Sequence, residues 1–115
     1  MNGVQLIAKE RERQKPVEGW SSQHDDGHED GELALAAACY ALPSNWRANV
    51  TRNVRHLTMT LDLRALLWPW QNGWWRPTPR DRVRELAKAG ALIAAEIDRL
   101  QRAERRKTRA ARPQV

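Results

Sequence analysis

Residues 81–106, DRVRELAKAGALIAAEIDRLQRAERR, decide the fold that this chain of 115 residues can adopt. Apolar side chains recur along the segment at steps of three and four residues, which is the periodicity of one helix face. They are Val83, Leu86, Ala87, Gly90, Ile93, Ala94, Ile97 and Leu100. The pattern predicts a long helix that begins near Pro79 or Asp81 and ends near Arg106.

A second segment, ELALAAACYAL at residues 32–42, is built from similarly small side chains. Asp30 is a suitable N-cap for a helix here, and Pro43 would end it. Glycine inside a helix costs about 1 kcal/mol relative to alanine, so Gly90 in the long helix indicates a close contact. We expect the two helices to pack against each other through Ala and Gly faces, with Cys39 as a buried, inert thiol.

The remaining segments complete a predicted all-α fold. Residues 4–15 fit a short helix, which the following proline ends. Residues 50–64 fit both a helix and a strand, and we favour the helix because a lone strand has no partner here. The prediction is a compact bundle of about four helices in a single domain, residues 1–106, with a Trp-rich loop. Residues 107–115 are expected to form a basic, disordered tail.

The charge and hydropathy of the sequence limit the classes of protein to which this chain can belong. The chain has a net charge of +6, and residues 99–115 contain seven basic side chains against Glu104 alone. No apolar run approaches the roughly 20 residues of a membrane-spanning helix. The N-terminus does not resemble a signal peptide, so we expect a cytoplasmic protein with no membrane contact. A monomer and a homodimer both fit, because Ala-rich helices also pack across dimer interfaces.

Acid is concentrated in residues 17–32, VEGWSSQHDDGHEDGE, which hold six carboxylates, two histidines and no Lys or Arg. We call this stretch the acidic segment, and its frequent glycines predict a loop. Imidazole and carboxylate groups are ligands for Mn, Fe, Ni and Zn, so one interpretation is a divalent-metal site. Its candidate ligands are His24, Asp25, Asp26, His28 and Glu32. The alternatives are a structural role, a basic partner surface, or neutralisation of the chain's own basic end.

Tryptophan is unusually frequent, with six Trp beside one Tyr and no Phe. Clustered Trp rings can stack on bases, and neighbouring arginines can pair with phosphates. Together they suit a nucleotide-type ligand. The candidate ligand-binding or partner-binding residues are Trp20, Trp68, Trp70, Trp74, Trp75, Arg76 and Arg80. In the alternative, two or three of these rings fill space beside the small-sided helices.

The basic C-terminal end resembles tracts that bind phosphate backbones without sequence specificity. The candidate nucleic-acid-binding residues are Arg99, Arg102, Arg105, Arg106, Lys107 and Arg109. Positive charge also suits a helix C-terminus on its own account, so simple solvation is the alternative. No recognisable motif for reading base sequence is present.

Seven landmarks in the chain are shared with one group of proteins. They are EGW at 18–20, HDDGH at 24–28, GELA at 31–34, CYA at 39–41, WPW at 68–70, WWRP at 74–77 and AGALIAAEI at 89–97. Together they cover most of residues 10–102 and resemble small, uncharacterised bacteriophage and prophage proteins. The resemblance implies a phage-associated accessory role in a bacterial host cell, and it assigns no activity to any residue.

We therefore expect a non-enzymatic accessory protein that binds a host factor or a nucleotide-type ligand and interferes with host defence or metabolism. No residue is assigned a catalytic role. A metal-dependent nucleotide pyrophosphohydrolase is the second interpretation, with Glu29-x-x-Glu32 and Glu96-x-Asp98 as the nearest approach to a magnesium site. The third is a nucleic-acid-binding module. An enzyme would aim three or more side chains of the acidic segment at one point, and we expect that segment to face the Trp-rich loop across a cleft.

Overall fold

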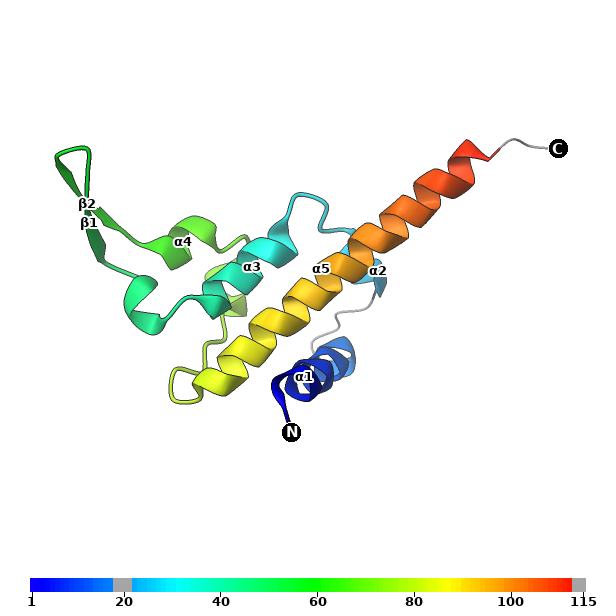
Figure 1. The fold of residues 1–115 in the computed structure, drawn as a ribbon, viewed down its shortest axis with the longest axis horizontal. Coiled ribbons are helices and arrows are strands. Elements are labelled where there is room, and N and C mark those ends of the chain that lie inside the picture. Colours follow the sequence, from blue (N-terminus) through cyan, green and yellow to red (C-terminus); the bar gives the residue numbers. More distant parts are fainter. Residues whose placement is uncertain (18–21, 113–115) are drawn as a thin grey trace.

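One long helix, α5 (Arg82–Ala111), forms the axis of the molecule, and the other elements lie along it (Figure 1). Asp81 caps its N-terminus, because the Asp81 carboxylate accepts a hydrogen bond from the backbone N–H of Arg84 at 3.1 Å. The helix thus begins where the sequence predicts it. It continues past the predicted end at Arg106 and reaches Ala111 as regular helix.

The computed structural model describes residues 1–17 and 22–112, and for residues 15–17 it describes the backbone alone. Trp20, one of the candidate binding residues, lies outside the described residues. Within them the chain forms five α-helices, two short 3-10 helices and one two-stranded antiparallel sheet. The all-α prediction is therefore wrong, although the fold is mostly helical. The described residues include no helix with the length and apolar character needed to cross a membrane.

The sheet is a β-hairpin in the segment for which a helix was favoured. Strand β1 (Val50–Val54) pairs antiparallel with β2 (Leu57–Leu61), and the strands are rich in the β-branched residues Val and Thr. Arg55 and His56 form the turn with φ angles of 50° and 67°, the left-handed backbone that a two-residue type I′ turn requires. The strand of the alternative interpretation does have a partner, which is the segment directly before it.

The core lies between α3 (Glu32–Ala41) and α5, which confirms that these two small-sided helices pack together. Its buried residues are Leu33, Ala36, Ala37, Cys39, Tyr40, Trp68, Ala89, Leu92 and Ala95. Cys39 is buried, as expected. Asp30 is not the N-cap of α3, because Gly31 takes that position with a φ of 82°. Glycine adopts this left-handed conformation without the Cβ penalty of other residues.

The apolar series from which α5 is predicted turns out to be only partly buried. Leu86, Ile93, Ile97 and Leu100 remain between 47% and 53% exposed. The face that packs on α3 is a neighbouring one, in which buried charged side chains accompany the small ones. It contains Glu85, Lys88, Ala89, Leu92, Ala95 and Arg99. The prediction of the helix is confirmed, and so is its packing on α3 through small side chains such as Ala89 and Ala95. The buried charged side chains on this face were not predicted.

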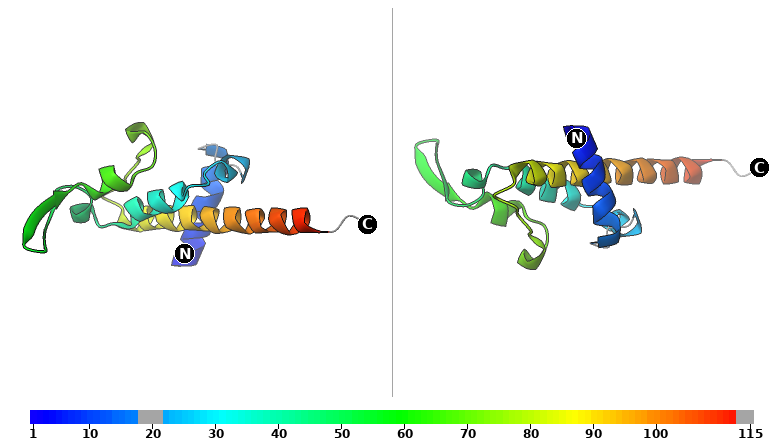
Figure 2. Two further views of the ribbon diagram at one scale, coloured as in Figure 1. Left: turned by 90° about the horizontal axis from the view of Figure 1, so that it is seen from above. Right: turned by 90° about the horizontal axis from the view of Figure 1, so that it is seen from below.

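Helix α1 (Gly3–Val17) crosses α5 at a steep angle (Figure 2). A capping box starts it, in which the backbone N–H groups of Asn2 and Gln5 each donate to the other residue's side chain. A Cβ added at Gly90 would lie 2.5 Å from Cδ1 of Ile7. The close contact that Gly90 predicts is therefore with a side chain of α1 and not with α3.

We expect Gly90→Ala to destabilise the protein by about 1–3 kcal/mol, in spite of the higher helix propensity of alanine. The new methyl group would overlap Ile7, so α1 has to move or the Ile7 side chain has to turn away. Ile7→Ala removes the overlap, and the double variant should be more stable than the sum of the single changes predicts. Urea unfolding of the four proteins measures this coupling, and strictly additive effects would contradict the contact.

Four short elements connect the long ones: α2 (Ser22–Asp26), the 3-10 helix η1 (Ser44–Trp46), α4 (Leu63–Leu67) and the 3-10 helix η2 (Asn72–Trp74). The molecule measures 63 × 39 × 26 Å with a radius of gyration of 17.2 Å. A compact domain of this length would have about 13 Å. The expected compact bundle is thus an elongated molecule instead.

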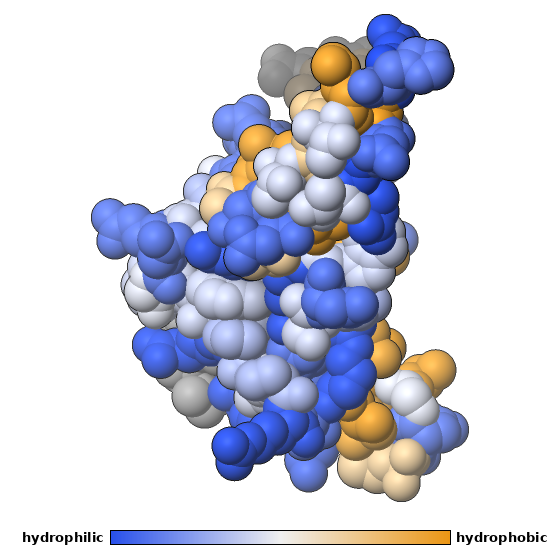
Figure 3. Space-filling model, turned by 90° about the vertical axis from the view of Figure 1, so that its left-hand side faces the viewer, coloured by the Kyte–Doolittle hydropathy of each residue, from blue (hydrophilic) through white to orange (hydrophobic). Residues whose placement is uncertain are grey.

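Two projections account for this shape, with the hairpin at one end and the C-terminal part of α5 at the other (Figure 1). Figure 3 looks at the hairpin end and shows hydrophobic side chains along the hairpin. Among them Val54, Leu57 and Met59 are exposed, with Leu57 at 66%. The two ends therefore differ in character, because the opposite projection is strongly basic.

Candidate functional site

Two of the five candidate metal ligands are bound by the chain's own arginines. Asp25 is completely buried and accepts a hydrogen bond from Nη2 of Arg11 in α1 at 3.0 Å. Asp26 accepts from Nε of Arg102 in α5 at 2.9 Å, and it also pairs with Arg106. The acidic segment thus ties α1 and α5 together through α2. Asp26 fits the interpretation that the acidic segment neutralises the chain's own basic end, because its cationic partners belong to that end.

These ion pairs also link stability to pH. The hydrogen bond from Arg106, supported by Arg102, holds the pKa of Asp26 below its ordinary value of 3.8 although desolvation opposes the shift. Burial raises the pKa of Glu85, but hydrogen bonds and charge from Arg47 and Arg82 hold it below 4.5 overall. A carboxyl group with a depressed folded-state pKa stabilises the fold above its unfolded-state pKa. That contribution is lost as the pH falls through the folded-state pKa.

We expect the free energy of unfolding to decrease as the pH falls below about 4, and Asp26→Asn to remove part of that decrease. Urea unfolding at a series of pH values measures it. Asp98→Asn is the matched control, since exposed Asp98 has no hydrogen bond or ion pair in the described part of the chain. An acid response that is identical in wild type and Asp26→Asn would show that this ion pair contributes nothing.

The two histidines of the acidic segment point toward each other. Nε2 of His24 lies 3.2 Å from Nε2 of His28, and Nδ1 of His28 lies 3.1 Å from Oε2 of Glu32. In the described residues no three His, Cys, Asp or Glu side chains are arranged to hold a metal ion. The five candidate ligands therefore separate into three groups: Asp25, bonded to α1; Asp26, bonded to α5; and the His24–His28–Glu32 chain.

The acidic segment meets the Trp-rich loop by direct packing. The rings of His28 and Trp70 lie 5.1 Å apart between centroids. Trp68 is 8% exposed and belongs to the core, while Trp70 and Trp75 pack against it. Trp74 is 55% exposed. Most of the tryptophan cluster thus fills space beside the small-sided helices, and the surface keeps one largely exposed ring.

The arginines of that loop have different surroundings. Arg76 has an exposed side chain, but its backbone is anchored: its N–H donates to the Tyr40 hydroxyl at 3.1 Å, and its carbonyl accepts from Lys88 Nζ at 2.8 Å. Arg80 is exposed at the turn before α5. Buried Lys88 and Tyr40 therefore hold the loop on the core and leave the two guanidinium groups in solvent.

Sequence reasoning missed a buried and well-connected carboxylate, Glu85. This carboxylate is 1% exposed and accepts from Nη1 of Arg47 at 2.9 Å, from Nη1 of Arg82 at 3.3 Å and from the backbone N–H of Thr78 at 3.2 Å. A signal was present in the sequence, because Glu85 shares the helix face of Ala89 and Leu92. A charged residue on a face of small residues indicates a buried ion pair.

The two arginines that hold Glu85 also cap the C-terminus of α3. Arg47 donates to the carbonyls of Cys39 and Tyr40, each at 3.2 Å. Arg82 donates to the carbonyls of Tyr40 and Leu42 at 2.9 and 3.0 Å, and to that of Ala41. The last carbonyls of a helix lack intrahelical partners, and positive charge is favourable there. The network fixes α3, α5 and the loop between them as one unit.

The basic end of α5 is an ordered helix that projects from the body of the molecule (Figures 1 and 2). We call residues 101–112 the basic arm. At its root, Arg99 is buried and bonded to Glu96 at 2.5 Å, and Arg102 and Arg106 hold Asp26. Further out, the exposed cations form no ion pair within residues 1–17 and 22–112. They are Arg105, Lys107, Arg109 and Arg112.

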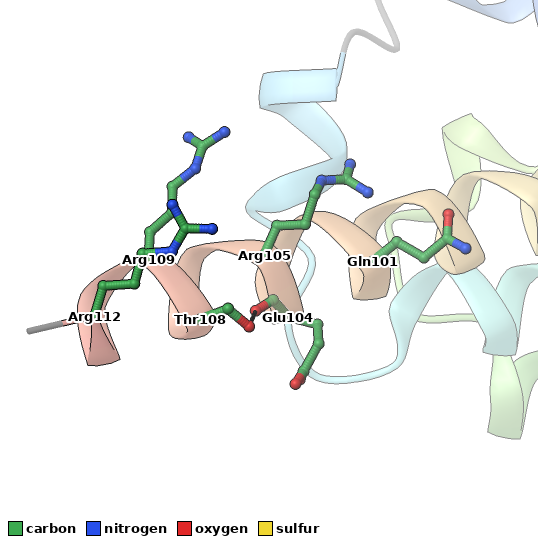
Figure 4. Close-up of a pocket in the computed structure, with 6 residues that line it drawn as sticks. All are labelled: Gln101, Glu104, Arg105, Thr108, Arg109 and Arg112. Carbon is green, nitrogen blue, oxygen red and sulfur yellow. Dashed lines mark hydrogen bonds between the residues drawn. The ribbon is translucent and has the colours of Figure 1, made fainter.

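Figure 4 shows how these side chains lie on the arm. Arg105, Arg109 and Arg112 follow one another at steps of four and three residues, so they share one side of the helix. Glu104 extends to the opposite side. A shallow groove runs along the helix here, lined by Gln101, Glu104, Arg105, Thr108, Arg109 and Arg112. The arm thus presents a row of guanidinium groups that no acid of its own covers.

Comparison with protein families, with curated proteins and with solved structures finds no match for this chain.

Proposed function

We propose that this protein is a non-enzymatic phage or prophage accessory protein that binds nucleic acid through its phosphate backbone, with the basic arm as the contact surface. One observation carries the proposal. Four exposed cations without an ion pair in the described residues lie on a helix that projects clear of the body. They are Arg105, Lys107, Arg109 and Arg112.

The dimensions and chemistry of the arm support this partner. An α-helix with its side chains is about 10–12 Å across, and the major groove of DNA is about 12 Å wide. Guanidinium groups bind phosphates in a bidentate manner that suits close backbone contact. The sequence contains no recognisable motif for reading base edges, so we expect binding with little sequence preference.

A nucleotide-type ligand held by the tryptophan cluster receives less support. Trp68 is buried, and Trp70 and Trp75 pack on the core, so their faces are occupied by protein. Only Trp74 of the described tryptophans is more than half exposed. The hydrolase interpretation also receives less support, since Glu96 is bonded to Arg99, and Asp25 and Asp26 of the acidic segment are bonded to arginines.

The acidic segment has a structural role in this proposal. Asp26 holds Arg102 and Arg106 at the root of the arm, so it fixes the direction in which the outer arm leaves the body. It also keeps the segment's negative charge beside the root, at a distance from the outer cations. Because its negative charge is bonded at the root, the acidic segment does not draw the outer cations of the arm back onto the body of the protein.

The proposal is tested by fluorescence anisotropy with a short labelled DNA duplex and three proteins. Arg105→Gln/Arg109→Gln/Arg112→Gln removes three charges from the arm and should weaken binding by about tenfold or more. The matched control removes three exposed charges elsewhere: Arg55→Gln/Arg80→Gln/Arg84→Gln. We expect the control to bind like wild type. Equal losses would mean that net charge alone matters, and a loss in the control alone would move the contact to the other end of the molecule.

A further inference from the structure

A second site on the molecule has the geometry of a metal-binding pair. His24 is exposed, His28 is partly buried, and their Nε2 atoms approach to 3.2 Å. The rings are nearly perpendicular, at 79° with centroids 4.8 Å apart. The two nitrogens therefore meet at their edges and the ring faces do not stack.

Glu32 determines which nitrogen of His28 carries the proton. Its Oε2 lies 3.1 Å from Nδ1 of His28, and its Oε1 accepts from the backbone N–H of Asp30 at 2.6 Å. An ionised carboxylate only accepts, so Nδ1 of neutral His28 is the donor. The Nε2 lone pair of His28 then points toward His24.

We propose that His24 and His28 bind one late transition-metal ion, of the class Zn²⁺, Ni²⁺ or Cu²⁺, through their Nε2 atoms. Two nitrogens each about 2.0–2.1 Å from a tetrahedral Zn²⁺ ion are about 3.4 Å apart. The separation of 3.2 Å is close to that value. Glu32 holds the far nitrogen of His28, as carboxylates do behind metal-binding histidines, where they orient the ring and raise its basicity.

The surroundings restrict which ion can bind. Asp25 and Asp26 are bonded to arginines, so the pair supplies nitrogen ligands and no carboxylate from these residues. Mg²⁺ and Ca²⁺ prefer oxygen ligands and should not bind here. Within the described residues no third side chain of the His, Cys, Asp or Glu type converges on the pair. Cu²⁺ should bind more tightly than Ni²⁺ or Zn²⁺, as it does at most nitrogen sites.

Isothermal titration calorimetry of the chelator-treated full chain tests the site with Zn²⁺, Ni²⁺, Cu²⁺ and Mg²⁺ added singly. We expect one late transition-metal ion per chain and no heat from Mg²⁺. His24→Gln and His28→Gln should each abolish this binding. His56→Gln is the matched control, because it changes the third histidine of the chain, which lies in the hairpin turn. Binding that survives in His24→Gln and His28→Gln, or is lost equally in His56→Gln, would overturn the proposal.

The Glu32→Gln variant distinguishes a role of Glu32 in orienting His28 from a role in the stability of the fold. It should weaken metal binding roughly 10–100-fold without changing the stoichiometry. It should also move the imidazole ¹⁵N shifts of metal-free His28 away from those of the Nδ1–H tautomer, which a general loss of stability would not do. Unchanged shifts together with unchanged affinity would exclude Glu32 from the site.

The metal-site proposal and the proposal of nucleic-acid binding by the basic arm can be disproved independently of each other. The histidine pair lies in the acidic segment, and His24→Gln and His28→Gln leave every cation of the arm in place. We expect these variants to bind DNA like wild type, so their calorimetry tests the metal site alone.

Discussion

Glu85→Leu should destabilise the protein by about 3–5 kcal/mol, the cost of leaving a buried charge without its partner. Its carboxylate is 1% exposed, and the Arg47 side chain that it pairs with is 9% exposed. Removal of Glu85 leaves the guanidinium of Arg47 buried and takes away an acceptor for Arg82 and Thr78. Small domains have a total stability of about 5–15 kcal/mol, so a large part of it would be lost.

Chemical unfolding by urea, followed by circular dichroism, measures this loss. Glu104→Gln is the matched control, since Glu104 is an exposed acid on the same helix. Its effect should stay within about 0.5 kcal/mol. A Glu85→Leu protein that is as stable as the control would contradict the role of this network in holding α3 and α5 together.

Asp25→Ala should destabilise the protein by a similar amount, about 3–5 kcal/mol, because it also leaves a buried charge without its partner. Asp25 is fully buried and Arg11 is 7% exposed, so the substitution leaves a guanidinium inside the protein. Within residues 1–17 and 22–112, Nε and Nη1 of Arg11 have no hydrogen-bond partner, which makes Asp25 the main compensation for this charge. The same change would cost little if the acidic segment were a solvated loop.

Two comparisons make the result specific. Asp30→Asn changes an exposed acid in the same segment and should shift stability by less than about 0.5 kcal/mol. Arg11→Met/Asp25→Leu removes both charges together and should recover most of the loss, since apolar replacement of a buried pair is often neutral. A double variant as unstable as Asp25→Ala would contradict the explanation by an unpaired charge.

The parts of the fold that follow from local pattern could be predicted from the sequence. The start of α5 at Asp81 and the packing of α3 on α5 follow from capping chemistry and from the spacing of small residues. Burial of Cys39 follows from its Ala-rich surroundings. These features depend on neighbours within a few turns of helix, which one sequence contains.

Other features depend on contacts that no local pattern contains. The hairpin turns through Arg55 and His56, which lack the Asn–Gly signature of a type I′ turn, so its two strands were taken for one ambiguous segment. The apolar series of α5 includes large side chains, among them Ile93 and Ile97, that remain about half exposed. Leu92 and the alanines beside it bury a different face, because α3 approaches closely only where side chains are small.

The charged residues of the candidate site could be identified from the sequence, but most of the ion pairs that join them could not. The sequence indicated that acid could neutralise the basic end, and Asp26 bonds Arg102 and Arg106. It did not indicate that Asp25 pairs with Arg11, because a buried pair of this kind joins segments whose approach depends on the whole fold. It also did not reveal that the basic end continues as regular helix to Ala111.

The salt dependence of duplex DNA binding tests the central claim most directly. Four phosphate contacts by the exposed cations of the arm predict a plot of log K against log salt concentration with a slope of about −3.6. Arg105→Gln/Arg109→Gln/Arg112→Gln should bring that slope close to −1, since about one unit is lost per phosphate contact removed. A wild-type slope near zero, or the same slope in both proteins, would contradict backbone binding by the basic arm.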